Sequence, residues 1–138
     1  MTQTFQNHRR FYPLFHFFLV PVAFAAFVVS IWNTSETTDY THVSISFLFF
    51  LVLVTAYTAR TSALKAQDRA IRAEMSLRYF ILSGKMIPAE LRMGQIVALR
   101  FASDAEVIAL TERAAKDQLS AKQIKQEITN WKGDYNRV

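Results

Sequence analysis

A row of alanines follows one heptad spacing through the middle of the chain, across a sharp change in polarity. All six alanines between residues 56 and 73 lie at alternating intervals of three and four residues, and two larger apolar residues continue the row. The members of this alanine seam are Ala56, Ala59, Ala63, Ala66, Ala70, Ala73, Leu77 and Phe80. The seam begins in an apolar segment and continues past Arg60 into a charged one. This pattern predicts one uninterrupted helix that leaves a membrane and offers a smooth face to another helix.

Alanine also has the highest helix propensity, so its abundance here could reflect helix formation alone. Propensity does not explain why every alanine of the segment falls on one seam, and we therefore interpret the seam as a packing surface. The first apolar segment has a matching face of small residues at Ala23, Ala26 and Ser30, which predicts pairing within the membrane. Farther along, residues 63–73 need another partner. The C-terminal segment and a second subunit both remain open.

Two apolar segments have the length of membrane spans. As a helix, residues 11–32 extend about 33 Å, which is enough to cross a hydrocarbon core. Arg9 and Arg10 before this run are also typical of a signal peptide, but the run is longer than a usual h-region and no small-residue cleavage pattern follows it. Residues 43–59 contain no charged residue and extend about 25 Å. We expect a transmembrane helical hairpin over residues 11–59.

The charged residues predict the orientation of this hairpin. The polar connector between the spans carries Glu36 and Asp39 and has no lysine or arginine. The basic residues beyond the other ends of the spans are Arg9, Arg10, Arg60, Lys65, Arg69 and Arg72. By the positive-inside rule both termini lie in the cytoplasm. The formal net charge of +5 follows from this asymmetry, so we expect the bilayer and its anionic headgroups as partners, and no nucleic acid.

The chain divides into four predicted parts. Residues 1–10 form an N-terminal cytoplasmic arm and residues 11–59 the two-helix hairpin. Residues 60–82 form a cytoplasmic extension of the second helix, which Gly84 ends. Residues 83–138 form a cytoplasmic subdomain of short helices. The predicted fold class is therefore an all-α membrane protein.

Two capping boxes, residues 103–106 and 120–123, predict the starts of two helices in this subdomain. In each box a serine precedes a Glu or Gln by three positions, so side chains and backbone amides can satisfy one another. The second helix should carry Ile124, Ile128 and Trp131 on one apolar stripe. One or two further turns are expected over residues 94–101. So small a subdomain buries a limited core, and we expect it to pack on the projecting helix or on a neighbouring subunit.

The sequence has few residues suited to catalysis or to metal binding. The absence of cysteine excludes disulfides, thiol catalysis and cysteine-based metal sites. His16 and His42 lie near opposite ends of the hairpin, about 20 Å apart along the helix axis, and cannot share a metal. His8 could approach His16, but the neighbouring residues supply no third or fourth metal ligand. The three glycines form no phosphate-binding loop. We expect no catalytic residues, metal or other cofactor, and no enzyme.

Four blocks of sequence carry a family resemblance. They are QNHRRFYPLFHF at residues 6–17, QDRAIRAEMSLR at 67–78, ALRFASDAE at 98–106 and IKQEITNWKGDYNRV at 124–138. Together they resemble an uncharacterised family of short bacterial two-span membrane proteins, a domain-of-unknown-function family, over nearly the whole chain. The resemblance implies a bacterial inner-membrane protein with a cytoplasmic helical tail. It brings no assigned activity, substrate or catalytic residue.

The same blocks gather polar groups that we expect on the cytoplasmic side. Our hypothesis is a hydrogen-bonded and ionic network that holds the tail beneath the membrane, with Arg69 and Arg72 paired to Asp104 or Asp134. The expected members are His8, Arg9, Gln67, Asp68, Arg69, Arg72, Arg100, Asp104, Trp131, Asp134 and Arg137.

Two functions are compatible with these features. The first is a structural or accessory membrane protein without enzymatic activity, as a homo-oligomer or as a subunit of a larger membrane complex. The alternative is a small oligomeric channel or transport component, with Ser44, Ser46, Thr55 and Thr58 as its polar lining. These four residues do not share one helical face, and neither span carries a ring of charge. The first function is therefore favoured.

Overall fold

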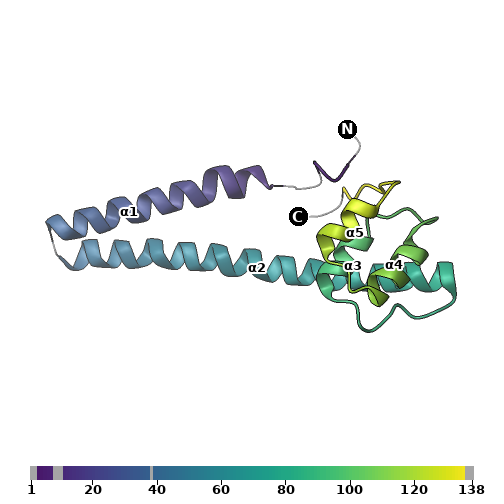
Figure 1. The fold of residues 1–138 in the computed structure, drawn as a ribbon. Helices are drawn as coiled ribbons and strands as arrows, with labels where there is room; N and C mark the ends of the chain where they lie inside the picture. Colours follow the sequence, from purple (N-terminus) through teal and green to yellow (C-terminus); the bar gives the residue numbers. More distant parts are fainter. Residues whose placement is uncertain (1–2, 8–10, 38, 136–138) are drawn as a thin grey trace. The chain divides into compact units, whose positions relative to one another are not determined.

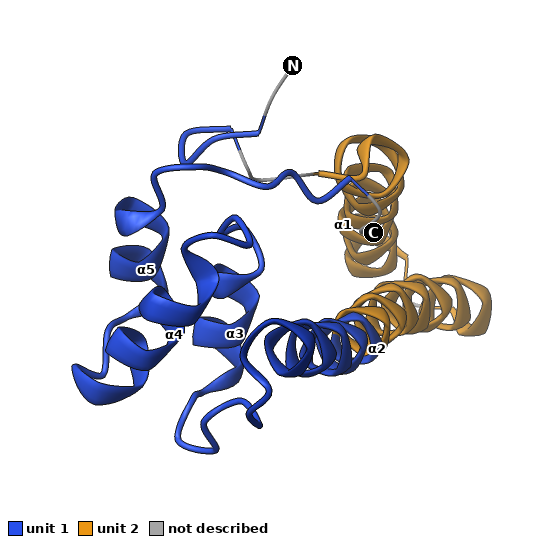
Figure 2. Ribbon diagram, turned by 90° about the vertical axis from the view of Figure 1, so that its right-hand side faces the viewer, with its two compact units in different colours: residues 1–10, 65–138 blue, residues 11–64 orange. Residues whose placement is uncertain are grey.

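The structure is a computed structural model that describes residues 3–7, 11–37 and 39–135, and the regular elements of this part are all helical (Figure 1). They are the π-helix η1 (Leu14–Leu19), α1 (Val20–Glu36), α2 (Tyr40–Ser83), α3 (Met93–Leu99), α4 (Val107–Lys116) and α5 (Ala121–Glu127). The predicted all-α class is confirmed. The chain forms two compact units, residues 11–64 and residues 1–10 with 65–138, which are coloured separately in Figure 2.

The first apolar helix begins as a wide π-turn and continues as an α-helix. Pro13 precedes η1, and Pro21 lies at the start of α1. Proline donates no backbone hydrogen bond, and its ring would clash with the carbonyl four residues earlier, here that of Phe17. The wider π-turn before Pro21 relieves this clash. The helix ends at Glu36, four positions beyond the predicted Trp32.

Small and polar side chains join the two helices of the hairpin. Ala23 and Ser30 of α1 are buried, as the small-residue face predicted, and the hydroxyl oxygens of Thr34 and Ser46 lie 3.0 Å apart. The α2 side chains with reduced exposure over residues 40–60 follow a heptad row of their own: His42, Ser46, Phe49, Leu53, Ala56 and Arg60. Of the alanine seam, only Ala56 belongs to this row. The first helix therefore packs beside the seam rather than along it.

The second helix is continuous over 44 residues, as the seam predicted. It ends at Ser83, one residue beyond the expected boundary. Gly84 follows with a φ of +70°, and its amide donates to the carbonyl of Phe80 at 2.8 Å. Glycine adopts this left-handed conformation without steric strain, which makes it an effective helix end.

The C-terminal segment buries its core against one face of α2. Ile71, Met75 and Tyr79 lie on that face and are at most 7% exposed. Ile71 and Met75 join one apolar cluster with the buried residues Leu91, Ile96, Ala98, Leu99, Phe101, Ala102, Val107, Leu110, Ala114, Ile124 and Ile128. The segment therefore packs on the projecting helix, which is one of the two arrangements expected.

Two helices of this segment are shorter than predicted. The helix expected from Ser103 begins at Val107, and the helix expected to reach Trp131 ends at Glu127. Trp131 instead forms an isolated antiparallel bridge with Ala102, and its ring lies 5.1 Å from that of Phe101. These contacts compete with helix continuation, so the predicted stripe through Trp131 was wrong.

Candidate functional site

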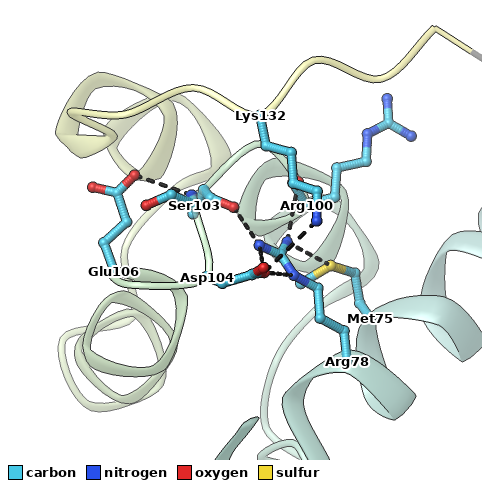
Figure 3. A network of polar contacts seen from close by, with 8 residues as sticks. Met75, Arg78, Arg100, Ser103, Asp104, Glu106 and Lys132 are labelled. Carbon is cyan, nitrogen blue, oxygen red and sulfur yellow. Dashed lines mark hydrogen bonds and ion pairs between the residues drawn. The ribbon is translucent and has the colours of Figure 1, made fainter. Parts of the chain in front are cut away.

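Arg78 of α2 is the centre of a polar cluster at the base of the C-terminal segment (Figure 3). Its Nε donates to Asp104 Oδ1 at 2.7 Å, and its Nη2 donates to the carbonyl of Ala102 at 2.7 Å. Lys132 Nζ lies 3.7 Å from the same Asp104 oxygen. Arg78 thereby fastens α2 to the connection between α3 and α4. The hydrogen bond from Arg78 lowers the pKa of Asp104 from its ordinary 3.8, and the positive charges of Arg78 and Lys132 act in the same direction.

A second ion pair joins the residue after α3 to the segment that follows α5. Arg100 Nη1 lies 3.2 Å from Asp134 Oδ2, and the Arg100 guanidinium lies 4.7 Å from the ring centre of Phe101. The backbone of Asp134 is held in turn by Gln3, whose side-chain amide donates to the Asp134 carbonyl at 3.0 Å and accepts from its amide at 2.9 Å. These bonds connect residue 3 of the N-terminal arm to the far end of the chain.

Glu106 connects the start of α4 to the segment that follows α5. Its carboxylate accepts from the backbone amides of Ser103, Thr129 and Asn130, each at 3.2 Å, and from the Thr129 hydroxyl at 2.7 Å. Burial raises the pKa of Glu106, but the hydrogen bonds from these residues outweigh it, and the pKa lies below the ordinary 4.5. The carboxylate explains why α5 stops, because it takes up the amides just beyond Ile128.

The structure brings some of the expected network together and leaves other members apart. Arg100, Asp104, Trp131 and Asp134 do lie in contacts described above. Arg69 and Arg72 are exposed on α2, and the expectation that they pair with Asp104 or Asp134 was wrong. Asp104 instead binds Arg78, and Asp134 binds Arg100. Packing of the core fixes the positions of Arg78 and Arg100 beside these carboxylates.

The remaining members of the expected network are two half-buried residues of α2 and three residues outside the described part of the chain. Gln67 and Asp68 are half-buried on α2. His8, Arg9 and Arg137 lie outside the described residues.

Sequence reasoning missed Arg78 and Glu106 as central residues. Arg78 lies four positions after Glu74, but the two form no ion pair in the described part of the chain. A signal was present: Arg78 lies seven positions after Ile71, on the apolar face opposite the seam. Glu106 was identified only as half of a capping box. Its bonds to Thr129 could not be read from local spacing.

The alanine seam is exposed beyond the hairpin. Its residues from Ala59 to Ala73 are all exposed, and Leu77 and Phe80 keep 60% and 49% of their surface accessible. The C-terminal segment covers the opposite face of α2, through Ile71 and Met75. Of the two partners left open for the lower seam, the chain's own C-terminal segment does not cover it in the described part of the chain.

Two grooves lie away from the core. One, of about 320 Å³, borders the end of α2 and is lined by Glu74, Leu77, Arg78, Ile81, Leu82, Asp104 and Lys132. Another of about 320 Å³ lies on the hairpin, lined by Ala26, Val29, Ser30, Asn33, His42, Ile45 and Phe49. Within residues 3–7, 11–37 and 39–135, no group of three or more His, Asp or Glu is placed to hold a metal ion. The polar cluster joins segments of the chain through hydrogen bonds and ion pairs. Its geometry therefore indicates a structural role.

The fold defines the class of protein. It is an all-helical chain with two helices, Leu14–Glu36 and Tyr40–Ser83, that are long and apolar enough to cross a membrane. Residues 1–138 match the model of a family described as a family of unknown function (DUF6526), and the chain belongs to this family. The resemblance to an uncharacterised family is thus confirmed. No curated protein and no solved structure matches the chain.

Proposed function

We propose that the protein is a non-enzymatic integral membrane protein that acts as a structural or accessory component of a helical assembly. The observation that carries the proposal is the exposed seam on α2, a continuous helix whose opposite face is already occupied by the C-terminal segment. A helix face of small and large apolar residues is well suited to close contact with another helix. The partner is a second copy of the chain or another membrane protein.

Insertion into a bilayer is supported by the surface of the hairpin. Its large side chains point outward: Phe17, Phe18, Phe24, Phe47 and Leu48 are each 58% to 69% exposed. Contiguous apolar surface of this extent is unfavourable in water and favourable against lipid. We place the protein in the bacterial inner membrane with both termini in the cytoplasm. The exposed Lys65 and Arg72 then face anionic headgroups.

The topology can be tested with single cysteines, because the natural chain has none. Glu36→Cys places a thiol in the connector, and Lys85→Cys places one after α2. In intact cells, a membrane-impermeant maleimide should label the Glu36→Cys variant, whereas the Lys85→Cys variant should react only after permeabilisation. The reverse pattern would contradict the orientation, and labelling of both in intact cells would contradict insertion.

Assembly can be tested by native mass spectrometry after gentle extraction from the membrane. We expect a particle heavier than one chain and with fixed composition. Ala70→Glu should shift it to the monomer, because a facing helix would bury the carboxylate without a partner. Ala109→Glu adds the same side chain on the exposed surface of α4 and serves as the control. A monomer for the natural protein would overturn the proposal.

The alternative of a small oligomeric channel has weaker support. Ser46 was one of four residues expected to line a pore, but it is buried within the hairpin and its hydroxyl lies 3.0 Å from that of Thr34. Conductance of the purified protein in planar bilayers would favour the channel.

A further inference from the structure

The exposed face of α2 has the residue pattern of a two-stranded coiled coil. Within residues 65–83, Ala66, Ala70, Ala73, Leu77 and Phe80 occupy the inward a and d positions of a heptad. All five are exposed. In Figure 2, α3, α4 and α5 lie on one side of the blue part of α2. The seam lies on the opposite face from their contacts, so a second helix can approach it without displacing the core.

Two charged residues flank this face, one on each side. Arg69 directly precedes Ala70 and occupies a g position, whereas Glu74 directly follows Ala73 and occupies an e position. Both side chains are exposed, and neither forms an ion pair with another residue in the described part of the chain. Arg78 lies four positions after Glu74 and could neutralise it, but Arg78 forms an ion pair with Asp104 instead.

The spacing of these charges matches one partner. In a parallel pair of helices, a g residue faces the e residue five positions later on the other strand, and opposite charges there select partner and orientation. Arg69 and Glu74 are separated by five positions. Two copies of α2 in parallel register would therefore form this pair twice, once on each side of the seam.

We propose that the occupant of the seam is a second copy of this chain, with α2 parallel to α2 and with Arg69 of each copy paired to Glu74 of the other. The inference rests on the proposed membrane function, because copies inserted with the same topology carry α2 out of the bilayer in the same direction. An antiparallel pair would instead bring g against g and e against e, and would not form the Arg69–Glu74 contact.

The space beside Glu74 also suits this arrangement. The groove of about 320 Å³ at the end of α2 includes Glu74, Leu77 and Ile81, so it borders the seam on the e side. Ile81 is 71% exposed there. A parallel second helix would cover Leu77 and would bring its g-side residues over this groove. The apolar surface that the single chain leaves in water would then be buried.

Cysteine crosslinking tests the face. In the cysteine-free chain, Ala66→Cys and Ala73→Cys place thiols at d positions, and Lys65→Cys and Arg72→Cys place them on the same helix at exposed c positions as controls. Oxidation with copper phenanthroline in native membranes should give dimer in the d-position variants, at a yield about tenfold above the controls. The reason is that d positions, unlike c positions, bring two copies within disulfide range. Equal yields at the c positions would overturn the inference.

A charge exchange tests the register. In the Ala73→Cys background, R69E and E74R should each lower the crosslinked dimer by about tenfold, because each variant opposes like charges on both sides of the seam. The double variant R69E/E74R should restore it. If the single variants lower the crosslinked dimer and the double variant does not restore it, the Arg69–Glu74 pairing is overturned. It is also overturned if neither single variant changes the amount of crosslinked dimer.

The two proposals fail in different ways. If the seam thiols do not crosslink to one another while native mass spectrometry shows the chain in a complex with a different protein, the self-pairing is wrong and the accessory function stands. If the chain is not recovered in the membrane fraction, the proposed function itself is wrong.

Discussion

Arg78 binds Asp104 across 26 positions of sequence, with Nε at 2.7 Å from the carboxylate oxygen. The same guanidinium also donates a hydrogen bond to the carbonyl of Ala102. Its planar group of N–H donors therefore binds a carboxylate and a backbone oxygen at once. This side chain, from the last turns of a long helix, binds the connection between α3 and α4. The polar cluster thereby decides how the C-terminal segment sits on α2.

Replacing Arg78 by lysine should loosen this attachment. Lysine keeps the charge but loses the fork, and we expect the free energy of unfolding of the C-terminal unit to fall by about 1–3 kcal/mol. Thermal unfolding in detergent and the rate of limited proteolysis would measure the change. Arg72→Lys changes an exposed arginine on the same helix and should leave both readings within about 0.5 kcal/mol of the natural protein. Equal effects of the two variants would contradict the role of Arg78.

Acid should destabilise the C-terminal unit through Glu106 and Asp104. Both have a pKa in the folded protein below the ordinary values of 4.5 and 3.8. A lowered pKa contributes stability that is present above the unfolded-state value and is lost as the pH falls through the folded-state value. The melting temperature should therefore fall below about pH 4.5.

Glu106→Gln should flatten this acid response, because it removes a titrating group that accepts four hydrogen bonds. The variant should also be less stable at neutral pH, by about 1–3 kcal/mol. Glu112→Gln removes an exposed carboxylate from α4 and is the matched control. An unchanged acid response in Glu106→Gln would show that other groups control it.

Two glycines should respond to alanine with opposite signs. Gly84 has a φ of +70° and open space around it, so Gly84→Ala meets no clash but costs about 1 kcal/mol in backbone strain. Gly94 lies within α3, and an added Cβ would sit 3.9 Å from that of Ala121, an ordinary contact. Gly94→Ala should raise the stability by up to about 1 kcal/mol. Chemical denaturation of both variants would check the sign, and a stabilising Gly84→Ala would contradict the account of how α2 ends.

The two capping boxes should differ in strength. Ser120 forms both reciprocal bonds, accepting from the Gln123 amide at 3.3 Å and donating its own amide to the Gln123 side chain at 2.8 Å. Ser120→Ala should therefore cost about 0.5–2 kcal/mol. At Ser103 the structure has the bond from its backbone amide to Glu106, which alanine would keep. Ser103→Ala should accordingly cost less in the same denaturation experiment, and an equal or larger cost would contradict the difference.

Local patterns predicted local structure well in this chain. The apolar runs gave two long helices, and the seam predicted that α2 continues without a break to Gly84. The box at residues 120–123 started α5 where it was expected. The capping box at residues 103–106 did not start α4 at Ser103, because the Glu106 carboxylate also accepts hydrogen bonds from Thr129 and Asn130. Spacing along the chain cannot reveal a competing partner from another segment.

The polar network shows the same limit. Arg100, Asp104 and Asp134, three of the expected members, form ion pairs in the structure. Their pairings were not predictable. Arg69 and Arg72 have the same chemistry as Arg78 and Arg100 but are exposed on α2. The tertiary structure decided which arginines reached a carboxylate.

The sequence alone determined the helical class, the two apolar helices, the continuity of α2 and the position of its end, because these follow from periodicity, propensity and the backbone freedom of one glycine. Only the tertiary structure decided that the C-terminal segment covers Ile71 and Met75, that Arg78 holds Asp104, and that α5 stops before Trp131. Those features depend on contacts between residues distant in sequence, whose free energies compete with one another. The same competition left the alanine seam exposed, since a helix that buries one face against the core leaves the opposite face uncovered.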